Sequence, residues 1–91
     1  MTFADTDVPH LPAGVRLKSD AVRGTVMLLA PERAFTLNPV AVKVLGLVDG
    51  ERSVGAIVAA LAQEFNAPPE AIAADVIELL DELARKRVVE R

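Results

Sequence analysis

Residues 25–50 constrain the fold more than any other part of the chain, because they join a strand pair to a helix with no loop between them. The apolar run at 26–29 meets a turn at 30–32, and a short alternating run at 33–37 follows. Two paired strands are therefore expected here. The second of them lies at the edge of a very small sheet, where its outer backbone groups have no partner.

A helix begins immediately after this edge strand. Asn38 is a good N-cap, and Pro39 stands at the first helical position, where its missing N–H costs nothing. The helix is predicted to close at Asp49-Gly50, since glycine suits the left-handed position that follows a helix. Gly46 lies inside this span and weakens the helix by roughly 1 kcal/mol relative to alanine.

The rest of the chain supplies one more strand and two more helices. Residues 15–19 alternate apolar and polar side chains, as a half-buried strand does. Ser53 caps a second helix that Asn66 ends, and a third helix follows Pro68-Pro69. The predicted architecture is α+β and winged-helix-like, with a three-stranded antiparallel sheet followed by three helices in the order β-β-β-α-α-α.

Length and terminal composition set the domain boundaries. A chain of 91 residues makes one domain, which the sequence places at residues 11–91. Residues 1–10 show little periodicity, and we expect them to form a flexible N-terminal tail. They also lack the basic start and apolar stretch of a secretory signal, so a cytoplasmic location is expected.

The composition excludes several kinds of chemistry. The chain has no cysteine, which removes disulfides, thiolate metal sites and thiol nucleophiles. His10 is the only histidine and lies in the predicted tail, where we expect a solvated side chain. No run of 18 apolar residues could cross a membrane. We therefore expect no enzyme activity, no cofactor, no metal and no membrane contact.

Two features of the sequence resemble chemical sites, and each has a structural explanation. Asp75, Glu78 and Glu82 recur on one face of the third helix, but no second acidic helix would complete a divalent-ion site. Ser53 begins a helix, as the phosphopantetheine-bearing serine of carrier proteins does. However, Arg52 stands where a carrier has aspartate, and the N-cap role explains the serine. A phosphopantetheine carrier is thus the weaker of two alternatives.

The other alternative is a winged-helix DNA-binding regulator. Groove recognition needs Arg, Lys, Asn or Gln on an exposed helix, whereas residues 53–65 contain no basic residue. The third helix is basic only at its end, at Arg85, Lys86 and Arg87, which the helix dipole also explains. With a net charge of −3, the chain lacks a basic footprint, so no nucleic-acid partner is expected.

An edge strand beside a helix suits the binding of an extended peptide. The peptide adds to the sheet as a further strand, and side-chain pockets supply specificity. The strand would be Arg33, Ala34, Phe35, Thr36 and Leu37, and an apolar wall would come from Val76, Leu79, Leu80 and Leu83 of the third helix. The residues alone equally allow a merely tolerated edge, guarded by Glu32 and Arg33. The open edge also allows pairing with a second copy, as a homodimer.

The assembled pattern resembles the PqqD family of pyrroloquinoline quinone (PQQ) biosynthesis. The similarity covers roughly residues 11–89 and is carried by the order and spacing of short motifs: Arg16-Leu17-Lys18, Asp20, Arg23, Leu29-Ala30-Pro31-Glu32, Leu37-Asn38-Pro39, Leu47-Val48-Asp49-Gly50, Val54, Ile57, Val58 and Leu61. Each motif is common alone, and their combination is specific.

The resemblance implies a peptide chaperone of the kind called a RiPP recognition element, in which RiPP stands for a ribosomally made, post-translationally modified peptide. Such a domain takes the PqqA precursor peptide against its third strand, next to its third helix, and presents it to the radical S-adenosylmethionine (SAM) enzyme PqqE. Here that implies a peptide site at Arg33–Leu37 and the third-helix face, with Asp75 and Arg85 at the rim.

Overall fold

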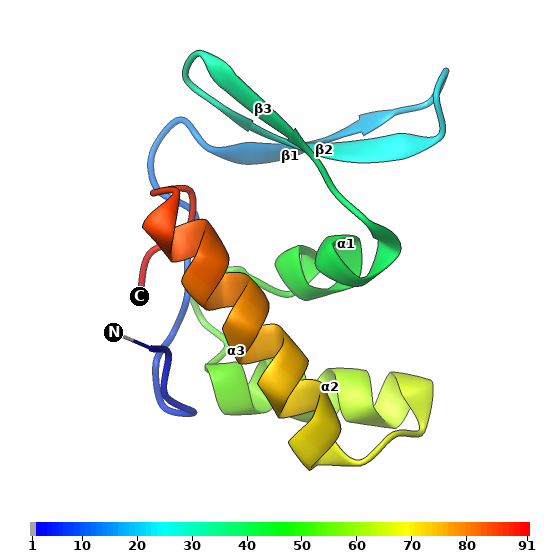
Figure 1. Cartoon of the computed structure of the whole chain (residues 1–91), viewed down its shortest axis with the longest axis vertical. Coiled ribbons are helices and arrows are strands. Elements are labelled where there is room, and N and C mark those ends of the chain that lie inside the picture. The colour runs from blue at the N-terminus through cyan, green and yellow to red at the C-terminus, as the bar shows by residue number, and fades with distance from the viewer. Residues whose placement is uncertain (1) are drawn as a thin grey trace.

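The computed structural model describes residues 2–91, and the predicted element order is confirmed (Figure 1). The fold is a three-stranded antiparallel sheet followed by three helices, and its likeness to a winged helix stays a prediction. The elements are β1 (Arg16–Asp20), β2 (Thr25–Ala30), β3 (Arg33–Thr36), α1 (Pro39–Gly46), α2 (Val54–Phe65) and α3 (Pro69–Arg85).

The sheet has β2 at its centre and β1 and β3 at its edges. Thr36 lies opposite Met27 and Ala34 opposite Leu29, so β3 pairs with β2 along its whole length. Within residues 2–91, no further strand covers the outer side of β3, which leaves that edge of the sheet open.

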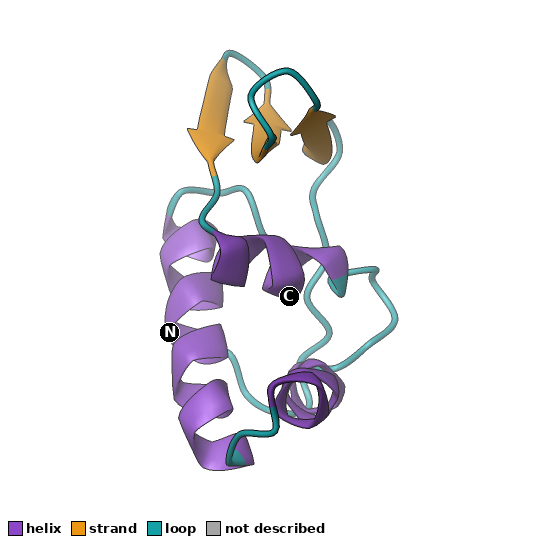
Figure 2. Ribbon diagram, turned by 90° about the vertical axis from the view of Figure 1, so that its right-hand side faces the viewer, coloured by secondary structure: helices purple, strands orange, loops and turns teal. Residues whose placement is uncertain are grey.

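The sheet forms a layer of its own above the helices (Figure 2). Helix α1 lies beneath it, α2 lies farther away, and α3 runs along the side of both toward the sheet. The core fills the space between these elements with aliphatic side chains, because the chain has only three aromatic residues. Its fully buried members are contributed by one strand, all three helices and the C-terminal segment: Leu28, Val44, Leu45, Val54, Ile57, Val76, Leu80, Val88 and Val89.

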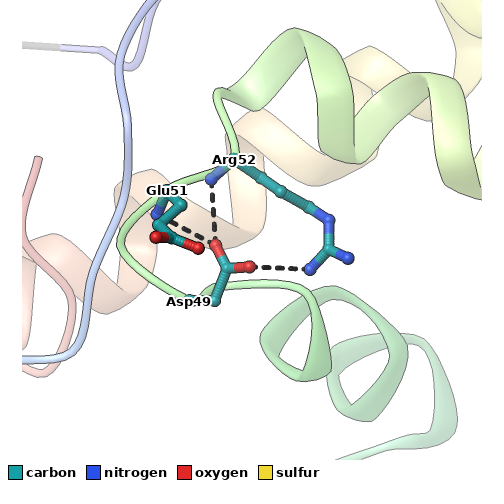
Figure 3. A network of polar contacts seen from close by, with 3 residues as sticks. All are labelled: Asp49, Glu51 and Arg52. Atoms are coloured by element: carbon teal, nitrogen blue, oxygen red, sulfur yellow. Dashed lines mark hydrogen bonds and ion pairs between the residues drawn. The ribbon is translucent and has the colours of Figure 1, made fainter.

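Helix α1 ends at Gly46 with Leu47 as its C-cap, before the predicted close at Asp49-Gly50. The prediction was wrong because the carboxylate of Asp49 competes for the backbone. Its Oδ1 accepts the N–H groups of Glu51 and Arg52, each at 2.9 Å, and Oδ2 accepts from the Arg52 guanidinium at 2.8 Å (Figure 3). Gly50 does adopt a left-handed backbone, with φ of 78°, but it serves this turn.

The same contacts act on the charge of the Asp49 side chain. Hydrogen bonds from the backbone of Arg52 and of Glu51, with the Arg52 charge nearby, lower the pKa of this carboxyl below its ordinary value. The turn between α1 and α2 is therefore built for an ionised aspartate.

The N-terminal segment packs on the domain, whereas the sequence predicts a flexible tail there. Phe3 is only 2% exposed and belongs to the core. The carbonyls of Asp5 and Asp7 accept the N–H groups of Gly55 and Val54, at 2.9 and 2.8 Å, and so cap α2. The N-terminal segment pairs with the start of α2, which is far away in the sequence. Such pairing leaves no periodic pattern in residues 1–10, so the sequence does not predict it.

The two ends of the domain also meet. His10 and Glu90 exchange backbone hydrogen bonds of 2.7 and 2.9 Å as an isolated antiparallel bridge. Their side chains lie 3.3 Å apart, with that of His10 42% exposed, so His10 is partly solvated but anchored. None of the helices in residues 2–91 is long and apolar enough to span a membrane.

Candidate functional site

The open edge of β3 presents the backbone groups of Ala34 and Thr36. The N–H of Leu37 donates to the carbonyl of Val26 at 3.2 Å, which fixes the phase of the ladder. Because hydrogen-bonded and non-hydrogen-bonded pairs alternate between antiparallel strands, Phe35 is bonded to β2 and its two neighbours are not. The N–H and C=O groups of Ala34 and Thr36 consequently point away from the sheet, ready to accept another strand.

Side chains of β3 take the two faces that the alternation predicts. Phe35 and Leu37 are half-buried and pack against the core, while Ala34 and Thr36 are exposed. One face of the strand therefore packs on the core, while its outer backbone groups stay unpaired within residues 2–91, as binding of an added strand requires.

Contacts at the C-terminal end of α3 hold β3 in place. The Arg33 Nη1 atom donates to the Lys86 carbonyl at 2.8 Å. The Arg33 guanidinium and the Lys86 ammonium each lie 5.6 Å from the centre of the Phe35 ring. Such cation–π contacts are worth about 0.5–1 kcal/mol each at exposed sites. They tie the hairpin to α3 and place two cations beside the strand.

A groove of about 220 Å³ continues from the end of β3 between α1 and α3. Its α1 wall begins with Asn38, two residues beyond β3. Its α3 wall consists of Asp75, Glu78, Leu79 and Glu82, and the remaining lining residues are Val40 and Ala41. The groove therefore begins two residues beyond the open edge of β3.

The burial of α3 divides the predicted apolar wall. Val76, Leu80 and Leu83 are 2%, 0% and 5% exposed and lie in the core, so they do not line the groove beside β3. This corrects the expectation of a four-residue wall, because the helix turns three of these positions inward. Leu79 alone is half-buried and lines the groove.

The two predicted rim residues differ in position. Asp75 is exposed and lines the groove, while Arg85 is exposed and lies outside the groove lining. Sequence reasoning did not assign Glu78 and Glu82 to the peptide site, although their spacing from Asp75 places all three on one helix face. The position of Lys86 beside Phe35 depends on tertiary packing and has no sequence signal.

Charge is graded along this surface. Carboxylates of Asp75 and Glu78 line the part near α1, and Arg33 and Lys86 lie at the hairpin end. Glu82 lies between them and pairs with the Lys86 ammonium at 3.3 Å. A peptide with basic residues near α1 and acidic residues near the hairpin would be electrostatically complementary.

The other candidate chemical groups have structural roles or are absent from residues 2–91. In residues 2–91, no group of three His, Cys, Asp or Glu side chains could hold a metal ion. The Ser53 hydroxyl oxygen accepts the N–H of Ala56 at 3.1 Å, which confirms its predicted N-cap role in α2. Asn38 likewise accepts from the N–H of Ala41 at 2.8 Å and caps α1 as predicted.

Known proteins are similar to this chain in both sequence and fold. The family described as coenzyme PQQ synthesis protein D (PqqD) matches residues 25–89. A "PqqA binding protein" of Rhizobium meliloti is 45% identical over 97% of the chain and 90% of its own length. A bifunctional coenzyme PQQ synthesis protein C/D of Methylorubrum extorquens is 52% identical over 98% of the chain, which spans 24% of that protein.

Two solved structures extend the comparison. The solution structure of the PqqD part of Methylobacterium extorquens PqqCD, described as a functional and stand-alone RiPP recognition element, superposes with a TM-score of 0.85. It is 52% identical and the match covers 98% of this chain and 95% of that one. A crystal structure of PqqD from Xanthomonas campestris gives a TM-score of 0.63 at 41% identity, covering 99% of this chain and 100% of that one.

Proposed function

This chain belongs to the PqqD family, and we propose that it binds the PqqA precursor peptide of PQQ synthesis by strand addition to β3. It is a peptide-binding recognition element and not an enzyme. One observation carries the proposed binding mode: the outward N–H and C=O groups of Ala34 and Thr36, on an open edge two residues from the groove between α1 and α3.

The binding mode follows from the geometry of the edge. The peptide backbone pairs with Ala34 and Thr36 and becomes the fourth strand of the sheet. Arg33 and Lys86 lie at one end of the bound strand, and Leu79 with the α3 carboxylates lies at the other. Backbone pairing supplies sequence-independent affinity, and these side chains supply selection for one peptide.

We further propose that the bound peptide is presented to the radical SAM enzyme PqqE. Strand addition holds the peptide extended along one edge and leaves its flanking segments accessible to a second protein. A cytoplasmic location belongs to the same proposal, because a ribosomally made peptide meets its binding protein where it is synthesised.

The test is a titration of ¹⁵N-labelled protein with synthetic PqqA. We expect the amide signals of Ala34 and Thr36 to move together with that of Leu79, at peptide concentrations that leave Leu17 and Ser19 on the opposite edge unmoved. Shifts confined to β1, or no shifts at all, would show that the peptide does not add to β3. Repeating the titration in the presence of PqqE tests presentation, since a ternary complex must retain the β3 shifts.

A further inference from the structure

A second hollow, of about 200 Å³, lies where α1, α2 and α3 meet. Two apolar side chains from each helix line it: Val40 and Val44, Leu61 and Phe65, and Ile72 and Val76. A dry cavity of about 150 Å³ with a similar lining takes up a molecule the size of benzene. The hollow is therefore large enough for one aliphatic or aromatic side chain.

The mouth of this hollow exposes apolar surface to solvent. Val40 is 57% exposed and Phe65 is 49% exposed, and in the described part of the chain Val22 is the one other large apolar residue classed as exposed. Two of the three such residues thus meet at one opening. Apolar surface gathered at a hollow in this way marks a binding site more often than scattered exposed residues do.

The hollow is continuous with the groove beside β3. Val40 and Asp75 line both, so a chain that leaves the edge of β3 along the groove passes directly over the opening. Polar groups at the rim do not close it. Lys43 forms an ion pair of 2.8 Å with Glu64. Asp75, on α3, lines both the groove and the hollow.

We propose that this hollow is an anchor pocket for one large apolar side chain of the PqqA peptide, next to the segment that pairs with β3. The inference rests on the proposed function and deepens it, because it names a second point of recognition. The acidic wall formed by Asp75 and Glu78 leads into the pocket, so the linking residues of the peptide carry basic side chains.

The position of the anchor relative to the added strand follows from the chain direction of β3, which runs toward α1. A peptide added antiparallel to β3 carries the anchor on the N-terminal side of its paired segment. A peptide added parallel carries it on the C-terminal side. The anchor is thereby assigned to one flank of the peptide once its direction is known.

Intermolecular nuclear Overhauser effects (NOEs) test the pocket directly. With labelled protein and unlabelled PqqA, we expect contacts from one apolar peptide side chain to the methyl groups of Val40 and Ile72 and to the Phe65 ring. Replacement of that peptide residue by alanine should weaken binding about tenfold or more, as burial of one large apolar side chain implies.

A pair of protein variants supplies a matched control. Phe65→Lys places a charge at the pocket mouth, and Val22→Lys places the same charge on the exposed β1–β2 turn. We expect Phe65→Lys to lower PqqA affinity about tenfold relative to Val22→Lys, with the core signals of both variants unchanged. The NOE measurement on the unaltered protein decides the question even if Phe65→Lys does not fold.

The outcomes separate this inference from the proposed function. Amide shifts at Ala34 and Thr36 without peptide contacts at Val40, Ile72 or Phe65 would overturn the anchor pocket and leave strand addition standing. Equal affinities for the two lysine variants would do the same. Absence of the edge shifts would overturn both proposals. Concentration-dependent contacts at the pocket without peptide would assign it to a second copy of the chain and overturn the anchor.

Discussion

Proline at position 36 removes one outward hydrogen-bond donor from β3 and should weaken peptide binding without unfolding the sheet. Thr36 is exposed and lies opposite Met27 in a pair that exchanges no ladder hydrogen bonds, so its N–H makes no contact with β2. Thr36→Pro therefore costs the fold little, apart from the restriction of φ to about −65°.

The expected magnitude follows from the loss of one backbone hydrogen bond. Such a bond contributes about 0.5–1.5 kcal/mol net, and the peptide carbonyl left without its partner adds to the loss. A total of about 1–2 kcal/mol corresponds to a Kd that rises roughly 5- to 30-fold. Isothermal titration calorimetry with synthetic PqqA at fixed salt measures this change.

The opposite edge of the sheet provides the matched control. Ser19 of β1 faces Val26, whose backbone groups bond to β3, so the Ser19 N–H also points away from the sheet. Ser19→Pro carries the same substitution on the wrong edge and should leave the Kd unchanged. Strand addition at β3 is refuted if a folded Thr36→Pro protein binds PqqA as tightly as the unaltered protein, or if Ser19→Pro weakens binding equally.

Three further predictions concern the stability of the scaffold. Leu80 is fully buried, so Leu80→Ala should lower the free energy of unfolding by about 2–5 kcal/mol in urea titrations, and a loss under 1 kcal/mol would mean that the core closes over the gap. Ser53→Ala removes the α2 cap and should cost about 1 kcal/mol, with Ser53→Asp restoring most of it. Because hydrogen bonding lowers the pKa of Asp49, its ionised form stabilises the native state above the ordinary value of 3.8, and this contribution is lost as pH falls through the lower native pKa. The stability difference between the unaltered protein and Asp49→Asn should therefore shrink between pH 6 and pH 2.5 in urea titrations, and a constant difference would contradict this role.

Local signals in the sequence were enough to order the elements. Asn38 and Ser53 are N-caps whose side chains bond to the backbone three residues ahead, and such short-range chemistry is visible in the sequence. The phase of β3 could also be anticipated, since it follows from alternation. The end of α1 was not, because Asp49-Gly50 suits the end of a helix as well as the turn that Asp49 forms with the N–H groups of Glu51 and Arg52.

The sequence indicates which elements form the candidate site, but not which of their side chains are exposed. Periodicity identifies the apolar stripe of α3, but it does not distinguish Leu79 from Leu80. Only the packing of the helix shows that Leu79 lines the groove and that Leu80 lies in the core. Lys86 reaches Phe35 from a position 51 residues later in the chain (86 − 35), which no local pattern records. Long-range contacts of this kind add residues to the candidate site that the sequence does not predict.

The bridge between His10 and Glu90 has a consequence for covalent linkage. It brings the two ends of the chain together, as Figure 1 also shows, so a partner joined to either end starts from the same side of the domain. A peptide tethered there by a flexible linker would meet the β3 edge at an effective concentration set by linker length, in the millimolar range for short linkers. Equal linkers at the N- and C-termini should then give similar effective concentrations.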